Sequence, residues 1–423
     1  MSKTQKIILF IGVGLIGSSL IFLLINTLLK KDKNPNQNDV PNTNLFSLFD
    51  RPVNTNTNND EPVLDTNEPV TDEGGVLGQS APAKNYSLIS EQPIINFIPV
   101  EKTVDQISFS PDKKIPDAKV KKFGVRYIKY DGIVYEQYPG EVEQRLSTTV
   151  TARLGEAFIF NDSVVYRYSR EDMQTIETFI GTISKKEANL GTVVGDYLPK
   201  NVRSFSLNEK SGKFAGLISD ESRQSAQIIT GALGSVNRST ILKTTFTDWL
   251  LDWFDDNNLV LTSRASGKVS GSAYIVNTKD SSKTKITSGF GLTTKVLPFD
   301  AGVLISTVNE NQYETNLYKD KKLGFFPIKT VADKCTAASR VVVVCATPVA
   351  PQGVLPDDWY KGEVNYNDSI ISYAVETGTQ KVLIGSNETS TSFDIDIIKP
   401  SSDGKLIYFR DKKTGLLYKS KTE

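Results

Sequence analysis

Residues 399–420 read KPSSDGKLIYFRDKKTGLLYKS. Two short apolar runs, LIYF and LLY, each follow a cluster of small, polar and charged residues that favours a turn. Asp403 and Gly404 suit the tight turn of a β-hairpin, because Gly adopts a positive φ without steric penalty. The stretch therefore predicts short strands joined by tight turns.

The same order of apolar runs and turns recurs through residues 84–423. The turns between the first two runs lie near Asp117, Asp162, Gly212, Asn258, Gly302, Arg340 and Gly404, at spacings of 45, 50, 46, 44, 38 and 64 residues. A third run follows each pair, and in most copies a fourth follows. Four strands at this period are typical of β-propeller blades. The sequence predicts an all-β fold, a seven-bladed β-propeller, with six or eight blades as alternatives.

The last repeat contains only three predicted strands, because the sequence ends at Glu423 soon after GLLYKS. Residues 86–90, YSLIS, precede the first repeat and do not belong to it. We expect this segment to supply the missing fourth strand and to close the ring, which removes an open sheet edge.

These repeats carry a resemblance to a known family. Residues 401–409, SSDGKLIYF, resemble the Ser-Pro-Asp-Gly repeat of TolB-like propellers, which also occurs in prolyl-oligopeptidase-type peptidases. Residues 110–113, SPDK, resemble a degenerate copy with Lys in place of Gly. The order of features over residues 84–423 is similar to that of bacterial membrane-anchored TolB-like propellers. The resemblance implies the fold and hardly constrains the function.

Composition narrows the possible chemistry. The chain has no His, two Cys, and 49 basic against 49 acidic residues. The lack of His excludes Ser-His-Asp and Cys-His nucleophiles and imidazole-based metal sites, and it departs from the peptidases that share the repeat. The balanced charge gives no long-range attraction to nucleic acid. No cofactor, metal site or catalytic residue is predicted.

The N-terminus predicts a membrane anchor. Residues 7–29, IILFIGVGLIGSSLIFLLINTLL, carry no charge. As a helix rising about 1.5 Å per residue, this segment spans roughly 34 Å, which is enough to cross a bilayer. Lys30 and Lys31 follow directly, without the small-residue site of a cleaved signal peptide. We expect residues 1–33 to form an uncleaved single-pass anchor.

Residues 34–83 are rich in Asn, Thr, Pro and acidic residues. Such a segment cannot bury enough apolar surface to offset its ordering entropy, so it should be a disordered tether. The Lys residues on the two sides of the span are nearly balanced, but long C-terminal domains translocate largely regardless of charge. We expect a cytoplasmic N-terminus and an extracytoplasmic domain over residues 84–423 at the cell membrane.

Cys335 and Cys345 flank the predicted turn near Arg340. Residues at equal distances from a hairpin turn lie opposite each other, so a cross-strand disulfide is expected if the domain is outside the cytoplasm. Two buried free thiols are the alternative. Neither CxxC spacing nor other soft ligands accompany them, so a redox or metal role is not expected.

The 64-residue spacing marks an insertion at residues 346–368, ATPVAPQGVLPDDWYKGEVNYND. Its Pro content predicts a loop over one propeller face. Aromatic and acidic side chains on such a loop could stack on, and hydrogen-bond to, a sugar or peptide. The candidate binding residues are Asp357, Asp358, Trp359, Tyr360 and Tyr366. Alternatively, Trp359 and Tyr360 fold down as a plug over the central channel.

Two further groups of residues favour structural roles. Trp249 and Trp253 lie on one face of a predicted strand, which favours packing between adjacent blades over an exposed aromatic platform. Asp255 and Asp256 do not match the spacing of a calcium-binding loop, so we interpret them as a turn.

The function expected from the sequence is binding. A tethered propeller suits a scaffold or recognition module for an envelope protein, peptide or polysaccharide, with contacts from the loops of one face. The alternative is a carbohydrate-active enzyme without His, a glycosidase or lyase that uses Asp or Glu at the propeller face.

Overall fold

The computed structural model describes residues 85–106, 118–187, 190–220, 224–235, 237–387 and 392–422. The predicted anchor at residues 7–29, the predicted tether at residues 34–83 and the SPDK segment at residues 110–113 lie outside these ranges. In the part of the chain that the structure describes, no helix is long and apolar enough to cross a membrane.

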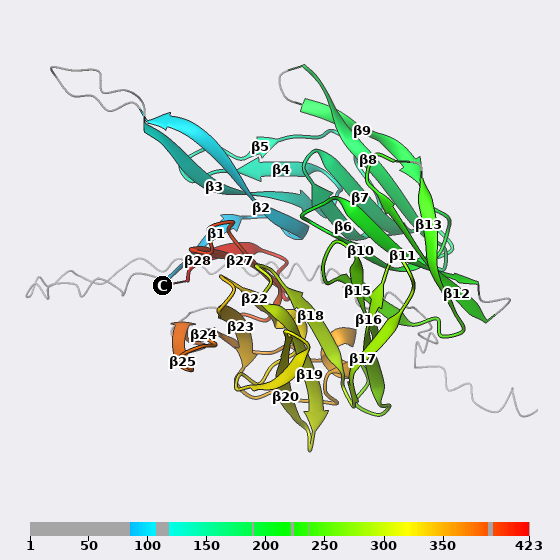
Figure 1. Ribbon diagram of the computed structural model, residues 1–423. Helices are drawn as coiled ribbons and strands as arrows, with labels where there is room; N and C mark the ends of the chain where they lie inside the picture. The colour runs from blue at the N-terminus through cyan, green and yellow to red at the C-terminus, as the bar shows by residue number, and fades with distance from the viewer. Residues whose placement is uncertain are drawn as a thin grey trace, which may run out of the picture. The chain divides into compact units, whose positions relative to one another are not determined.

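Seven antiparallel four-stranded sheets make up the described residues, which confirms the predicted seven-bladed propeller (Figure 1). Blade 1 contains β2 (Ile94–Gln106), β3 (Ala118–Lys129), β4 (Val134–Gln137) and β5 (Gln144–Arg145). Blade 2 contains β6 (Leu154–Phe160), β7 (Ser163–Ser169), β8 (Ile176–Glu187) and β9 (Leu190–Tyr197). Blade 3 contains β10 (Val202–Leu207), β11 (Lys213–Asp220), β12 (Ser225–Ala232) and β13 (Arg238–Thr244). Blade 4 contains β14 (Trp249–Trp253), β15 (Asn258–Ser263), β16 (Gly271–Asn277) and β17 (Lys283–Gly289).

Blade 5 contains β18 (Thr293–Leu297), β19 (Gly302–Asn309), β20 (Gln312–Lys319) and β21 (Lys322–Phe326). Blade 6 contains β22 (Cys335–Ala337), β23 (Val342–Pro348), β24 (Asp368–Ala374) and β25 (Thr379–Ile384), with the 3-10 helix η2 (Ala332–Lys334) before β22 and the short helix α2 (Asp357–Lys361) between β23 and β24. Blade 7 contains β26 (Ile395–Pro400), β27 (Leu406–Asp411), β28 (Leu417–Lys421) and β1 (Tyr86–Ser90).

Blade 7 joins the two ends of the propeller. β1 pairs antiparallel with β28, with Tyr86 opposite Ser420 and Leu88 opposite Tyr418 (Figure 1). The ring of Tyr86 packs edge-on against Phe393 at a centroid distance of 5.1 Å. The N-terminal strand thus covers the edge that β28 would otherwise expose.

The turn at Gly404 is fixed by two constraints. Gly404 has a φ of 72°, where a side chain is unfavourable, and a Cβ atom there would lie 1.8 Å from the carbonyl oxygen of Ala338 in blade 6. The Asp-Gly pair in the C-terminal repeat therefore serves both the hairpin and the contact between blades.

The first strand of each blade pairs with the second strand on one side only. Its other edge faces the central channel and has no strand partner among the described residues. Side chains of adjacent blades hydrogen-bond to several of these edges, which satisfies backbone groups that have no strand partner. These bonds include Asn96 Nδ2 to Ala157 O (2.7 Å), Leu251 N to Ser204 Oγ (3.1 Å) and Val296 N to Asp252 Oδ2 (3.0 Å).

Apolar side chains fill the space between blades. Trp253 is buried with Ala215 and Leu217 of blade 3, and its Nε1 donates to the carbonyl oxygen of Ser206 at 3.3 Å. Trp249 packs against the same cluster. The predicted packing of both Trp residues between adjacent blades is confirmed.

Candidate functional site

A cavity of about 2550 Å³ runs along the central channel and is lined by the first strands of all seven blades. One opening is formed by the turns between the first and second strands of the blades, and we call it the turn mouth. The other is formed by the loops between the second and third strands and by the links between blades, and we call it the loop mouth. Because successive strands of a blade run in opposite directions, these two groups of connections lie at opposite ends of the channel.

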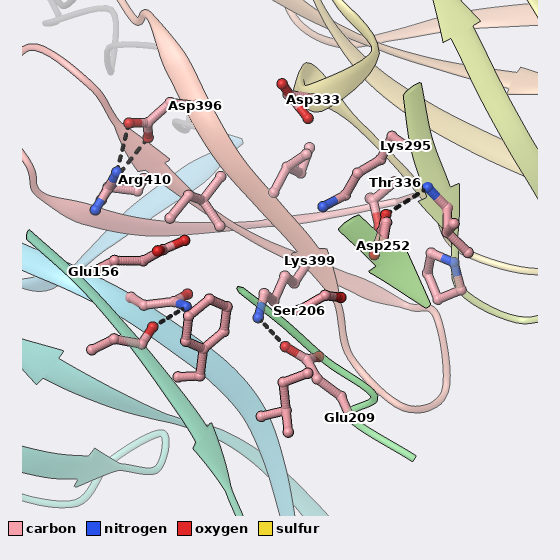
Figure 2. A pocket seen from close by; sticks show the side chains of 18 of the residues that line it. Glu156, Ser206, Glu209, Asp252, Lys295, Asp333, Thr336, Asp396, Lys399 and Arg410 are labelled. Carbon is pink, nitrogen blue, oxygen red and sulfur yellow. Dashed lines mark hydrogen bonds and ion pairs between the residues drawn. The ribbon is translucent and has the colours of Figure 1, made fainter. Parts of the chain in front are cut away.

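Charged groups meet near the middle of the channel (Figure 2). Although burial lowers the pKa of Lys295, the charges of Asp252, Asp333 and Glu209 together raise it above its usual value. Burial raises the pKa of Asp252, while Lys295 and the backbone N–H of Val296 oppose the rise. Lys295 is therefore an ammonium ion that faces the lumen among carboxylates.

On the channel wall opposite Asp252 and Lys295, ion pairs join the first strand of a blade to its second strand. Arg410 of β27 holds both oxygens of Asp396 in β26, with Nε–Oδ1 at 3.0 Å and Nη2–Oδ2 at 2.6 Å (Figure 2). The same guanidinium donates to the carbonyl oxygen of Ile94 in blade 1 at 3.2 Å. Arg167 and Glu156 form the equivalent pair in blade 2. These groups stabilise contacts between blades and also make the wall polar.

Ion pairs cross the turn mouth. Lys399 of blade 7 contacts Glu209 of blade 3 at 2.5 Å (Figure 2), and Lys210 of blade 3 contacts Asp300 of blade 5 at 3.0 Å. Blades 3 and 7 stand three places apart in the ring, so the first pair spans the channel. Arg340 is a further cation at the turn mouth, which also carries several other carboxylates, so that its acidic residues outnumber its basic ones. These other carboxylates are Asp255, Asp256 and Asp403.

The loop mouth has the opposite charge. Five cationic residues line it, and two carboxylates, Asp131 and Asp333, lie beside them among the described lining residues of the loops and links at this mouth. The cations come from β10, the β15–β16 loop, the β23–β24 loop and the β27–β28 loop. They are Arg203, Arg264, Lys361, Lys412 and Lys413.

The insertion folds onto the loop mouth and contains α2. Trp359 and Tyr366 are each only 3% exposed, so both rings lie inside the protein. Tyr360, between core and lumen, donates its hydroxyl to Asp333. Asp357 accepts the N–H of Gly267 at 2.6 Å, and Asp358 accepts the N–H of Val354 at 2.7 Å. The five predicted binding residues thus do not share one exposed surface. Their role in binding remains a prediction.

A buried cluster around Lys334 holds the insertion in place. The Lys334 ammonium is fully buried and donates to Asp368 and Asp394 at 2.7 Å each and to the carbonyl oxygen of Ile395 at 2.8 Å. It lies 4.6 Å from the ring centroid of Trp359, whose Nε1 donates to Asp394 at 2.9 Å. This cluster joins blades 6 and 7 to the base of the insertion.

Cys335 and Cys345 form a disulfide across β22 and β23, where the two residues are directly paired. Both are fully buried and form part of the core between blades 5 and 6. Within the residues that the structure describes, no group of three or more His, Cys, Asp and Glu side chains could hold a metal ion.

The residues that line the channel have only a weak signal in the sequence. Asp252, Lys295 and Asp396 lie in first strands that also carry buried apolar residues, so alternation alone allows either face. The basic loop mouth collects Arg264, Lys361 and Lys413 from three blades. These residues are too far apart in the sequence for any local spacing to relate them. Counting the charged residues of the loops and links separately from those of the hairpin turns could have revealed the basic mouth.

No family model matches the chain, and no curated protein matches it. Solved structures with a similar arrangement include the β-propeller domain of the Trilobed protease from Pyrococcus furiosus, at 11% identity and a TM-score of 0.43 over 64% of this chain and 81% of that chain. Oligogalacturonate lyase in complex with manganese is 11% identical, with a TM-score of 0.44 over 78% and 98% of the two chains. TolB from Acinetobacter baumannii is 11% identical, with a TM-score of 0.39 over 77% and 80%.

Proposed function

We propose that the chain is a membrane-anchored, extracytoplasmic propeller that binds an anionic protein segment or polysaccharide of the cell envelope at the loop mouth. The observation that carries the proposal is the separation of charge along the channel, because five cations face two carboxylates at the loop mouth, whereas carboxylates outnumber cations at the turn mouth. A mouth of one sign concentrates field lines and draws in ligands of the opposite sign.

The size and shape of the site support this proposal. The cavity of about 2550 Å³ exceeds the usual volume of a small-molecule pocket, so it has room for a segment of a polymer. The insertion narrows the loop mouth and presents Lys361 beside the lumen, with Tyr360 on the wall. The buried Lys334 cluster fixes the insertion, which lowers the entropy lost when a ligand binds.

The anchor and the orientation rest on the sequence alone. A tether between residues 34 and 83 would let the propeller search the space near the membrane. No observation favours the enzymatic alternative over binding.

Charge reversal at the loop mouth tests the proposal. The triple variant Arg264→Glu, Lys361→Glu and Lys413→Glu should weaken binding of polyglutamate and alginate by about tenfold or more, because rim charges govern encounter with a charged partner. The affinity of the propeller for both probes would be measured at two salt concentrations, with dextran as the neutral probe.

A matched control reverses the same number of charges elsewhere. Lys279, Lys283 and Lys285 lie exposed at the outer edge of blade 4, away from the channel lining. Their change to Glu should leave binding nearly unaltered. Equal losses in both triple variants would show that only net charge matters, and retained binding in the loop-mouth variant would refute the proposal. Capture of partners from cross-linked envelopes by wild type and variant would then identify the natural ligand.

A further inference from the structure

Blade 2 carries an aromatic surface that the channel does not use. Phe179 of β8 is opposite Tyr166 of β7 and opposite Tyr197 of β9. Tyr168 lies two residues after Tyr166 and therefore points to the same face of the sheet. Four aromatic rings from three strands thus share one face.

These rings run from the core of the blade to its surface. Tyr166 is 1% exposed and donates its hydroxyl to the carbonyl oxygen of Gly132 at 2.7 Å, so it belongs to the core. Phe179 and Tyr168 are half-buried, and Tyr197 is 54% exposed. The Tyr168 and Tyr197 hydroxyls lie 2.8 Å apart and fix the two outer rings relative to each other.

Gly181, two residues further along β8, makes room for the Phe179 ring. A Cβ atom at Gly181 would lie 2.7 Å from the Phe179 ring and 2.6 Å from a methyl group of Val193. The absence of a side chain at Gly181 lets the ring lean along its own strand. The ring of Phe179 then meets that of Tyr197 edge to face, with centroids 5.2 Å apart.

These outer rings form the floor of a groove of about 710 Å³. One wall is the link between blades 1 and 2, residues 149–153, which is held to β9 by the bond from Val193 N to Thr149 Oγ1 at 2.8 Å. The other wall is the start of the β7–β8 loop. The volume lies within the usual range for small-ligand sites.

The groove is electrically balanced. Arg153 of one wall and Glu171 of the other form an ion pair at 3.5 Å, and Arg170 and Asp172 add one charge of each sign. A charged ligand would gain no net attraction here. Hydroxyl and charged side chains around an aromatic floor suit a neutral ligand that has both apolar faces and many hydroxyl groups.

We propose that this groove of blade 2 binds a neutral carbohydrate chain, with a sugar ring stacked on the exposed ring of Tyr197 and in contact with Phe179. The C–H face of a sugar ring carries partial positive charge and matches the negative face of an aromatic ring. The hydroxyl groups of the sugar would exchange hydrogen bonds with Tyr168, Arg153 and Glu171 at the rim. The site is separate from the channel and does not depend on the function proposed for it.

The test uses purified cello-, chito- and manno-oligosaccharides as probes of the whole chain in detergent, followed by calorimetry and ligand-observed NMR. At least one of them should bind wild type. Tyr197→Thr, which preserves a strand-favouring residue at an exposed position, should weaken that binding roughly three- to tenfold, as expected for the loss of one ring contact. Phe179→Leu, which keeps apolar bulk, should do the same.

Phe325→Thr is the matched control, since Phe325 is an exposed ring, 81% accessible, on the outer strand of blade 5. It should bind the sugar as wild type does, and so should the triple variant at the loop mouth. If none of the three oligosaccharides binds, or if Tyr197→Thr and Phe179→Leu bind as tightly as wild type, the carbohydrate site is wrong. A protein ligand captured through these rings, without sugar binding, would equally overturn it.

Discussion

Lys334 shows how much a single residue of this chain depends on its surroundings. Its ammonium and the carboxylates of Asp368 and Asp394 are all fully buried. Burial raises the pKa of Asp368, and the charge of Lys334 opposes that rise. In the sequence these residues lie in three separate segments, and nothing in their local patterns distinguishes Lys334 from the many exposed Lys residues.

Lys334→Met should destabilise the propeller by about 3–5 kcal/mol, because it leaves two buried carboxylates without their cation. The free energy of unfolding in denaturant gives the measurement. Lys361→Met is the control, since Lys361 lies on the neighbouring helix with its side chain half-exposed, and it should change stability by less than about 1 kcal/mol. Similar small effects for both variants would contradict the buried cluster.

Asp252 gives a prediction that depends on pH. Burial raises the pKa of Asp252 in the folded chain, so the folded state binds the proton more tightly than the unfolded state. The stability from this group is therefore complete below about pH 4 and is lost as the pH rises through the folded pKa.

Asp252→Asn removes this titration while an amide oxygen can still accept the N–H of Val296. We expect the variant to melt at a higher temperature than wild type at pH 7, with the difference shrinking toward pH 4. Thermal unfolding at both pH values measures this. A variant that is less stable than wild type at pH 7 would show that attraction between Asp252 and Lys295 outweighs the cost of burial.

At the scale of elements, the repeat pattern predicted most strands, and the insertion was the exception. The hairpin turns that the structure describes lie close to where the sequence places them, and Asn161, Gly212, Gly302 and Gly404 supply a positive φ in four of them. The predicted turn near Asp117 lies outside the described residues.

The insertion was expected to be a loop, yet residues Asp357–Lys361 form α2, which Gly362 ends with a φ of 77°. The helix is only one turn long and buries Trp359 among Tyr313, Leu355 and Tyr366, so tertiary packing, not helix propensity, stabilises it.

The disulfide of blade 6 should act at this scale. It closes a loop with a sequence separation of 10, which in the chain-entropy model corresponds to about 2–3 kcal/mol. Reductant should therefore lower the melting temperature of wild type. The double variant Cys335→Ala and Cys345→Ala should melt near the reduced wild type and should not respond to reductant. A melting temperature that does not change on reduction, with reduction verified by thiol titration, would contradict this contribution.

For the whole molecule, the important feature is that the propeller is closed by segments from both ends of the chain. β1 and β28 are more than 300 residues apart in the sequence and adjacent in the sheet. Asn85 and Ser420 extend the connection, since the Ser420 hydroxyl donates to the Asn85 carbonyl oxygen at 2.8 Å. Without β1, the edge of β28 would be exposed and blade 7 would lose the packing of Tyr86.

Deletion of residues 86–90 should lower the melting temperature and increase aggregation, because it opens this edge. The control removes the same number of residues, 60–64, from the predicted tether and should leave thermal unfolding unchanged. Unfolding that is the same for both deletions would show that blade 7 is stable with three strands.

The sequence by itself determined the class of the fold, the number of blades and the approximate positions of the hairpin turns that the structure describes. Turn-favouring residues and alternating apolar residues are local properties of a sequence, and their recurrence in seven repeats makes the pattern recognisable. The site was decided by the tertiary structure. The charged mouths and the Lys334 cluster combine residues from blades that are far apart in the sequence, and the groove of blade 2 combines three strands of one blade with the link before it. The burial of these residues and the electric field around them depend on their distances in space. A sequence pattern does not encode them.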